Sequence, residues 1–154
     1  MKSSKLGNYF ESFKKGEIIT HSLSKTIFES DNNLFSLLTM NHHPVHLNVE
    51  HTKSHQHGKI LVVGTLVFSL VVGITVPDIS GKAIANLEYE QVKHVGPVFI
   101  GDTITAQTEV LDVYLTSKKD RGIVYVETIA FNQNKDVILT FRRKVLIPTE
   151  ANGN

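Results

Sequence analysis

The sequence predicts an α+β fold in which one antiparallel sheet wraps around a central apolar helix. Two observations support this prediction. Residues 64–76 are almost entirely apolar, and a helix that is apolar on all sides must be surrounded by other elements. The second half of the chain has long segments of alternating or β-branched residues, which are typical of half-buried strands. A sheet curled around the helix would bury both.

Before the apolar helix, we expect a lead-in, one strand and a first helix. The lead-in comprises residues 1–16, and the β-branched side chains of 18–27 predict a strand. Ser30 or Asp31 can cap the helix that follows, because both side chains accept a hydrogen bond from a free backbone N–H. We expect Pro44 to end this helix, since the residue before a proline avoids the α region. The apolar residues that recur at helical spacing are Leu34, Phe35 and Leu38.

A short polar helix is expected over residues 50–56, and Pro77 is expected to stop the apolar helix. The strands that follow are joined by short turns. Residues 132–136 have the length and the polar composition of a hairpin turn, and Gly96-Pro97 marks another turn. A short tail covers 149–154. The strands are expected over 84–94, 103–110, 122–131 and 137–147.

Length and composition favour one domain that spans residues 1–154. A chain of this length buries roughly two-thirds of the surface that its unfolded form exposes, and 41% of its residues are hydrophobic. The formal net charge of +1 gives no reason to expect a nucleic-acid partner. The longest apolar stretch, 60–76, is shorter than the roughly 20 residues of a membrane span, so we expect no membrane partner. The chain has no cysteine, which excludes disulfides and fits a cytoplasmic location.

His46 is the main candidate for proton transfer, because an imidazole with a pKa of about 6.5 can accept and donate a proton at neutral pH. A lone histidine near a helix end is more commonly structural or exposed. Asn41 lies five residues earlier, and its carboxamide can orient a water molecule by donating one hydrogen bond and accepting another. Asparagine is also common at helix C-termini. A carboxamide cannot take a proton, so in such a site His46 would perform both proton transfers.

Gly64 opens the predicted apolar helix, where unpaired backbone N–H groups bear the positive end of the helix dipole. Directed at a thioester oxygen, these amides would stabilise an enolate, and contacts of this kind contribute about 3–4 kcal/mol. Close packing of the helix against a strand would favour glycine equally well. The sequence leaves both interpretations open.

Two further groups of polar residues were considered as ligand sites. His51 and His55 stand four residues apart within a cluster of histidines, but no glutamate lies between them in the zinc-protease pattern, so we expect no metal. Basic residues cluster at 118–121 and 142–144, and we assign no ligand to them. Strand alternation places Arg143 on the opposite face from its two basic neighbours.

From about residue 8 to residue 148, the sequence resembles MaoC-type hotdog-fold acyl-CoA hydratases and dehydratases. The family's hallmark is an acidic residue, then Asn-Pro, then His, and it falls on Asn41, His43-Pro44 and His46 here. The chain departs from it at Asn41, which replaces the usual Asp, and at His43, which replaces Asn. Four segments resemble one branch of the family, the mesaconyl-CoA hydratases, also described as β-methylmalyl-CoA dehydratases. They are Leu38-Thr39-Met40-Asn41, Pro44-Val45-His46-Leu47, Ala85-Asn86-Leu87 and Ala130-Phe131-Asn132-Gln133. The glycine that opens the helix and residues 96–103 match the family as well.

The resemblance implies reversible hydration of a short, branched, acidic enoyl-CoA. Asn41, His46 and the Gly64 amide would be catalytic, and His43, Val63 and Thr65 would bind substrate. Coenzyme A would be part of the substrate, with no further cofactor, and the chain would form at least a homodimer. A substrate with its own carboxylate would repel a second one nearby, which suits Asn41.

Two alternatives remain at this stage. A hotdog thioesterase needs a carboxylate that activates water, and Glu50 is the nearby candidate, although it lies in the wrong part of the motif. A non-catalytic acyl-CoA-binding module is the other alternative, and the replacement of the usual Asp by Asn41 favours it.

Overall fold

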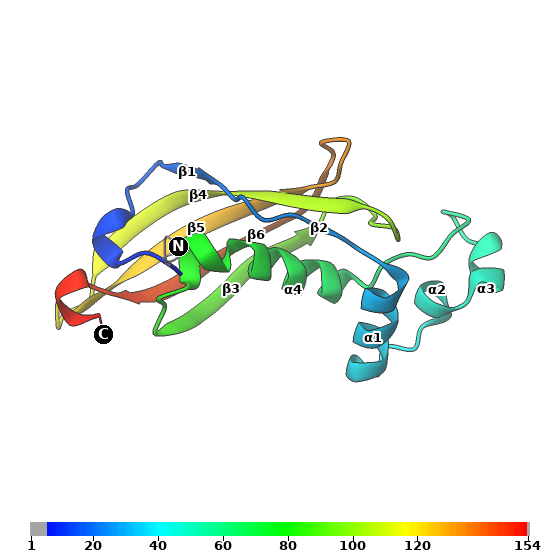
Figure 1. Cartoon of the computed structure of the whole chain (residues 1–154), viewed down its shortest axis with the longest axis horizontal. Coiled ribbons are helices and arrows are strands. Elements are labelled where there is room, and N and C mark those ends of the chain that lie inside the picture. Colours follow the sequence, from blue (N-terminus) through cyan, green and yellow to red (C-terminus); the bar gives the residue numbers. More distant parts are fainter. Residues whose placement is uncertain (1–5, 154) are drawn as a thin grey trace, which may run out of the picture.

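The computed structural model describes residues 6–153, so parts of the predicted lead-in (1–5) and tail (154) lie outside the described residues. Four α-helices precede or lie among six strands (Figure 1). The elements are η1 (Phe10–Ser12), β1 (Ile18–Thr20), β2 (Lys25–Thr26), α1 (Glu29–Thr39), α2 (Pro44–Leu47), α3 (Val49–Lys53), α4 (Gly64–Thr75), η2 (Val76–Ser80), β3 (Ala85–His94), β4 (Thr103–Leu115), β5 (Arg121–Phe131), β6 (Val137–Pro148) and η3 (Glu150–Asn152). Within these residues, no helix is long and apolar enough to cross a membrane.

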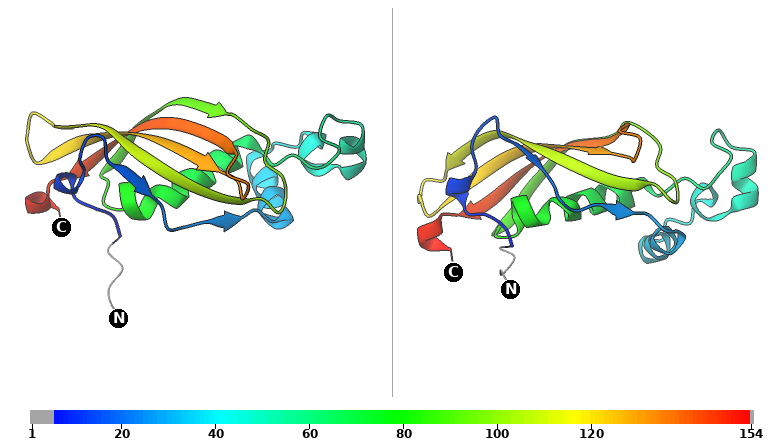
Figure 2. Two further views of the ribbon diagram at one scale, coloured as in Figure 1. Left: turned by 90° about the horizontal axis from the view of Figure 1, so that it is seen from above. Right: turned by 45° about the horizontal axis from the view of Figure 1, so that its top comes forward.

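The strands form one antiparallel sheet that curves over α4 (Figure 1). Its order is β1-β4-β5-β6-β3, and β2 extends the pairing along β4. Long ladders join β4 to β5 and β5 to β6, as the alternation of those segments predicts. The predicted α+β architecture, an antiparallel sheet around an apolar helix, is confirmed. Helices α1 to α3 extend beyond the N-terminal end of α4, away from the sheet (Figure 2).

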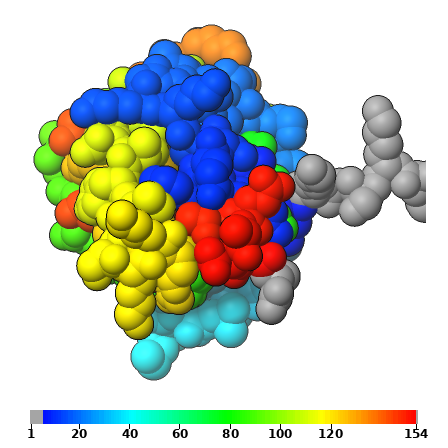
Figure 3. Space-filling model, turned by 90° about the vertical axis from the view of Figure 1, so that its left-hand side faces the viewer, coloured from blue at the N-terminus to red at the C-terminus, as the bar shows by residue number. Residues whose placement is uncertain are grey.

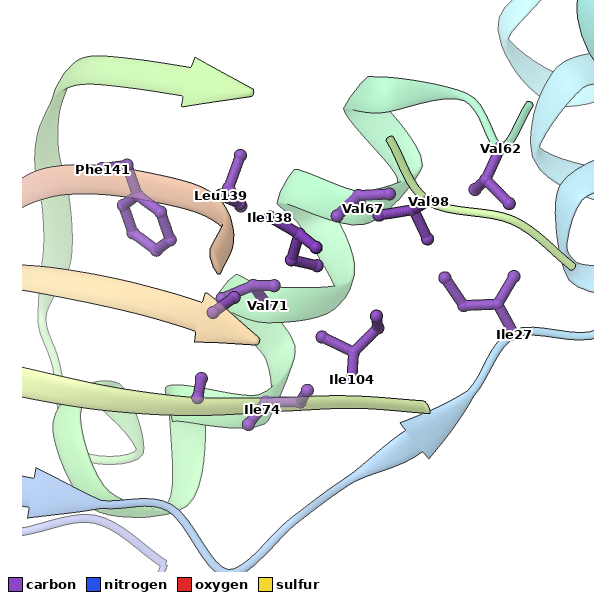
Figure 4. Close-up of a cluster of buried hydrophobic side chains, with 12 residues drawn as sticks. Ile27, Val62, Val67, Val71, Ile74, Val98, Ile104, Ile138, Leu139 and Phe141 are labelled. Carbon is purple, nitrogen blue, oxygen red and sulfur yellow. The ribbon is translucent and has the colours of Figure 1, made fainter. Parts of the chain in front are cut away.

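The main core lies between α4 and the concave face of the sheet (Figure 4). Val67, Val71 and Ile74 project from one side of α4 into this core and are fully or almost fully buried. The opposite side of α4, which includes Thr65 and Ser69, is exposed in the single chain. The expectation that other elements surround the helix is therefore met on one side only, because the sheet covers a single face.

A second apolar cluster ties the lead-in to the other end of the sheet. Phe13 is buried there against Ile79 and side chains of the long strands, with Phe10 packed beside it. The Glu150 N–H donates a hydrogen bond to the Glu11 carboxylate at 3.0 Å. The described N-terminal and C-terminal segments consequently lie side by side at this end (Figure 3).

The predicted first strand, 18–27, is interrupted. The His21 N–H donates a hydrogen bond to the Ala106 carbonyl, and Lys25 pairs with Ile104. Between these two contacts the segment advances by four residues, whereas β4 advances by only two. The extra residues cannot pair and bulge outward, which divides the segment into β1 and β2.

The first helix also differs from the prediction. Phe28, rather than Ser30 or Asp31, is the N-cap residue of α1, and the Asp31 carboxylate accepts a hydrogen bond from its N–H at 2.8 Å. Helix α1 ends at Thr39, because Met40 adopts the left-handed conformation, and Pro44 begins α2 instead of ending α1. The apolar residues Leu34 and Leu38 are exposed, while the polar residues Asn32 and Ser36 are buried.

The other predicted elements shift only slightly. The polar helix expected over 50–56 is α3, which starts one residue earlier and ends at Lys53. The apolar helix ends at Thr75, and Pro77 lies in the π-helical turn η2 that follows it. Strand β4 continues to Leu115, five residues past its predicted end, through a β-bulge between Val110 and Asp112.

Candidate active site

A cavity of about 370 Å³ opens at the N-terminal end of α4. Gly64 is the first residue of α4, and N–H groups in the first turn of a helix have no acceptor within the helix. His46, from α2, lines the same cavity. The sequence separates these two residues by eighteen positions, and the fold brings them to one site. Apolar side chains, among them Val67 and Val98, complete the wall.

A backbone carbonyl determines which nitrogen of His46 can act as a base. The Nδ1 atom lies 2.7 Å from the carbonyl oxygen of Leu61. A carbonyl oxygen only accepts hydrogen bonds, so Nδ1 bears the proton and its N–H donates a hydrogen bond to the Leu61 carbonyl. In the neutral imidazole the lone pair then belongs to Nε2, which is free to accept a proton. This arrangement is the tautomer that a general base needs.

Asn32 links His46 to the start of α4, and sequence analysis did not identify it. This residue is 1% exposed. Its Nδ2 donates to the His46 carbonyl at 2.9 Å, and its Oδ1 accepts from the Val63 N–H at 3.0 Å. Val63 directly precedes Gly64, so one carboxamide holds both halves of the site together. No pattern in the sequence marked this residue, because Asn32 lies off the helix face formed by Leu34, Phe35 and Leu38.

His94, at the end of β3, is a second residue that sequence analysis missed. A Cβ atom added to Gly64 would lie 3.0 Å from the His94 imidazole, so glycine allows a close approach of this ring. His94 also lines the cavity. The close-packing interpretation of Gly64 is therefore supported, and it does not conflict with exposed amides at the helix start. The one signal in the sequence was the predicted turn at Gly96-Pro97, which places the end of β3 just after His94.

The remaining predicted residues do not line this cavity. Asn41 is half-buried just after the end of α1, and its N–H donates to the Ser36 carbonyl at 3.1 Å. His43 caps α2 by accepting a hydrogen bond from the Val45 N–H, and its ring centre lies 6.1 Å from that of His46.

Val63 and Thr65 flank Gly64 along the chain. Val63 is buried and offers its N–H to Asn32 rather than to the cavity. Thr65 is exposed, and its N–H also belongs to the first turn of α4. In the single chain the cavity wall thus contains His46 and Gly64, and the other four predicted residues do not line it.

The histidine cluster that contains His51 and His55 is compact, but its side chains do not form a metal-binding arrangement. The ring centres of His51 and His55 are 4.4 Å apart. Within residues 6–153, no group of three or more His, Cys, Asp or Glu side chains is arranged to hold a metal ion.

Three of the six basic residues at 118–121 and 142–144, namely Arg121, Arg142 and Lys144, form ion pairs. Arg121 donates two hydrogen bonds to Asp120, and this hydrogen bonding lowers the pKa of the Asp120 carboxyl. Arg142 pairs with Glu127 at 2.7 Å, which raises the pKa of Arg142. Arg143, in contrast, is fully buried on the other face of β6, so the predicted alternation is confirmed.

Comparison with known proteins assigns the family. Residues 12–132 match the family described as MaoC like domain. The chain belongs to the MaoC-like family. The resemblance predicted from the sequence motifs is therefore confirmed, and it includes the segment from α1 to the start of α4 that contains Asn41, His46 and Gly64.

Relatives with assigned activities are enoyl-CoA hydratases. The mesaconyl-CoA hydratase of Cereibacter sphaeroides is 33% identical over 92% of this MaoC-like chain and 41% of its own length. The chain thus spans about two-fifths of that relative. The (R)-specific enoyl-CoA hydratase of Rhodospirillum rubrum is 36% identical over 67% of this chain and 69% of its own.

The fold agrees with solved structures of the same family. A crystal structure described as a putative MaoC domain protein dehydratase from Chloroflexus aurantiacus superposes with a TM-score of 0.92 and 32% sequence identity. The superposition covers 97% of this chain and 42% of that one. The MaoC-like chain therefore has the hotdog fold.

Proposed function

We propose that this protein reversibly hydrates an enoyl-CoA thioester. The observation that supports this function most directly is the pairing of His46 Nε2, with its free lone pair, and the first-turn amides of α4 in one cavity. A base and an oxyanion-stabilising helix start are the two groups that addition of water to a conjugated thioester requires. The hydratase activities of the MaoC-like relatives support the same reaction.

The proposed reaction uses these groups in sequence. The Gly64 N–H, with the Thr65 N–H beside it, donates to the thioester oxygen. His46 Nε2 takes a proton from a water molecule that Asn41 helps to orient, while the water oxygen bonds to the β-carbon. The electron pair of the double bond shifts through the α-carbon toward the thioester oxygen as an enolate. His46 then returns its proton to the α-carbon, and dehydration is the reverse.

We further propose that the substrate is short, branched and acidic, as in mesaconyl-CoA. The relatives named for mesaconyl-CoA match 92% of this chain. Asn41 stands where the family's hallmark has a carboxylate, which removes a negative charge that would repel an acidic acyl group. Coenzyme A is part of this substrate, and His43 and Val63 would shape the site around it.

A homodimer is proposed as the working assembly. The edge strand β3 presents apolar side chains, among them Leu87 at 50% and Val92 at 40% exposure, and α4 exposes Thr65 and Ser69 on its side away from the sheet. The chain covers less than half of the relative named for mesaconyl-CoA. A second copy would cover these surfaces.

A thioesterase activity is not supported by the position of Glu50. Its side chain is 79% exposed on α3 and pairs with Lys53 at 2.6 Å. It does not line the cavity, and its carboxylate already has a cationic partner, so its position gives no support to a role in activating water.

Loss of the ultraviolet absorbance of the conjugated enoyl thioester tests the proposal. Purified protein is incubated with mesaconyl-CoA and, separately, with crotonyl-CoA, and the variant His46→Ala is measured under the same conditions. We expect loss of the mesaconyl signal, and nearly complete loss of this activity in the variant while its circular dichroism is retained. Release of free CoA, or binding of both esters without turnover, would overturn the hydratase assignment.

A further inference from the structure

Arg143 is a buried cation that the proposed reaction does not use. It lies on β6, where the side chains of Arg142 and Lys144 point to the outer face and pair with carboxylates. Arg143 points to the opposite, helix-facing side and has no exposed surface. A fully buried arginine normally has an anionic partner, because removing a charge from water is costly.

The contacts of Arg143 leave its charge without a counter-ion. Nη2 donates to Thr75 Oγ1 at 2.7 Å, and Nη1 donates to Asn86 Oδ1 at 3.2 Å. Both acceptors are neutral, and Nε is buried without a hydrogen-bond partner. Among residues 6–153, no carboxylate lies within ion-pair distance of this guanidinium. Burial lowers the pKa of Arg143. The site therefore lacks one negative charge.

The position of Arg143 along α4 excludes the acyl group of its own chain. Its partner Thr75 is the last residue of α4, whereas Gly64 is the first. At a rise of about 1.5 Å per residue, these two ends are about 16 Å apart. The acyl part of a four- or five-carbon thioester extends only about 5–6 Å from its carbonyl carbon, so it cannot reach from Gly64 to Arg143 of the same chain.

Strand β3 provides a route to a second copy. It lies at one edge of the sheet and is ten residues long, and an unpaired edge of this length favours pairing with another chain. Its residue Tyr89 pairs with Arg143 in the ladder, and Asn86, near the start of the strand, accepts a hydrogen bond from Arg143. Its last residue, His94, lies beside Gly64. Antiparallel pairing of two β3 strands about a twofold axis would place the start of each strand opposite the end of the other.

We propose that Arg143 binds the distal carboxylate of a dicarboxylic acyl-CoA whose thioester is held by His46 and Gly64 of the partner subunit. This inference rests on the proposed hydratase function and names the residue that selects acidic substrates. The twofold pairing brings the guanidinium of one chain to the helix start of the other. Phe68 and Tyr89, whose ring centres are 5.2 Å apart, would line the intervening space and contact the methyl branch.

Selectivity between an acidic and a neutral substrate tests the residue. We expect Arg143→Met to lower kcat/KM for mesaconyl-CoA about 30-fold or more relative to kcat/KM for crotonyl-CoA, since a desolvated charge pair is lost. The matched control is Arg142→Met, on the outer face of the same strand, which should keep the wild-type ratio. Arg143→Lys retains the charge and should keep more of the preference than Arg143→Met, provided that both variants unfold cooperatively. An equal loss for both substrates in Arg143→Met would overturn the subsite while leaving the hydratase function intact.

Binding of unreactive esters separates this proposal from the reaction. Calorimetry with succinyl-CoA and butyryl-CoA should show that Arg143→Met weakens binding of the acidic ester alone. If that selective loss occurs and the wild type hydrates neither enoyl-CoA, the carboxylate subsite stands and the hydratase function fails. Equal binding of succinyl-CoA by the wild type and the variant would overturn the subsite.

Mixed dimers test the contribution of the second copy. His46→Ala and Arg143→Met chains with different tags are co-expressed, and the mixed dimer is purified through both tags. If each site combines His46 of one chain with Arg143 of the other, one of the two sites is intact and about half of the wild-type activity on mesaconyl-CoA returns. No recovery would show that the two residues do not meet across the interface and would overturn the shared site.

Discussion

Replacing Asn32 with leucine should damage both stability and activity, because this side chain joins the two halves of the site. Leucine has a similar size but can neither donate to the His46 carbonyl nor accept from the Val63 N–H. Both hydrogen bonds, at 2.9 Å and 3.0 Å, are lost together. Ser36, the other buried polar residue of α1, makes no hydrogen bond through its Oγ, so it does not share in this link.

The size of the effect follows from burial. The Val63 N–H is enclosed, and leaving a buried donor unpaired costs about 1–3 kcal/mol. The His46 carbonyl is only partly buried, so water can hydrate it and its cost falls at the lower end of the same range. We expect a total of about 2–4 kcal/mol in the free energy of unfolding. A displacement of His46 by about 1 Å relative to Gly64 would in addition lower kcat about 100-fold.

Urea unfolding and steady-state kinetics on the folded variant measure the two effects separately. Asn33→Leu is the matched control, because Asn33 is the neighbouring residue of α1 and is exposed. The control should change the free energy of unfolding by less than about 0.5 kcal/mol. If Asn32→Leu unfolds at the wild-type urea concentration and keeps the wild-type kcat, the proposed link between α1, His46 and α4 is wrong.

Three further predictions follow from single contacts. Gly64→Ala places a methyl group 3.0 Å from the His94 ring, so we expect about a 10-fold loss of kcat/KM. The double variant Gly64→Ala with His94→Ala should recover part of this loss. No recovery would exclude the clash with His94 as the cause. His46→Ala should abolish turnover while its thermal unfolding temperature stays within a few degrees of the wild type, and retained activity would contradict its role as the base. The pKa of Asp31 in the folded protein is lowered, chiefly by a hydrogen bond from Lys25. The ionised carboxylate therefore stabilises the fold at pH values above its ordinary pKa. This stabilisation is lost as the pH falls through the lowered pKa of the folded state. Asp31→Asn should therefore destabilise the protein at neutral pH, and its difference from the wild type in urea unfolding should shrink below about pH 4.

Hydrophobic periodicity predicted most of the fold because α4 and the long strands bury regular faces. Strand alternation over β4 to β6 is expressed directly as inward and outward side chains. The helix predicted for α1 forms, but its apolar side chains Leu34 and Leu38 are exposed and Asn32 is buried. Periodicity assumes that the apolar face is the buried one, and specific hydrogen bonds outweigh that rule in α1.

The candidate site was only partly predictable. His46 and Gly64 were identified from residue chemistry and from a family motif, and the fold places both in one cavity. Asn32 and His94 were missed because neither belongs to a motif of the predicted reaction. Their roles depend on contacts across 31 positions of the chain in one case and 30 in the other, which no local pattern encodes.

The sequence by itself determined the elements, the family and the chemical groups available for catalysis, because each depends on residue type and short spacing. Tertiary structure alone decided how these groups are arranged and which partners they have. Packing of the chain before α4 placed the Leu61 carbonyl against His46 and so selected its tautomer. Closure of the sheet over α4 enclosed Arg143 beside neutral acceptors and left its charge unbalanced. Both outcomes depend on which distant atoms exclude water from a polar side chain, and only the folded chain brings those atoms together.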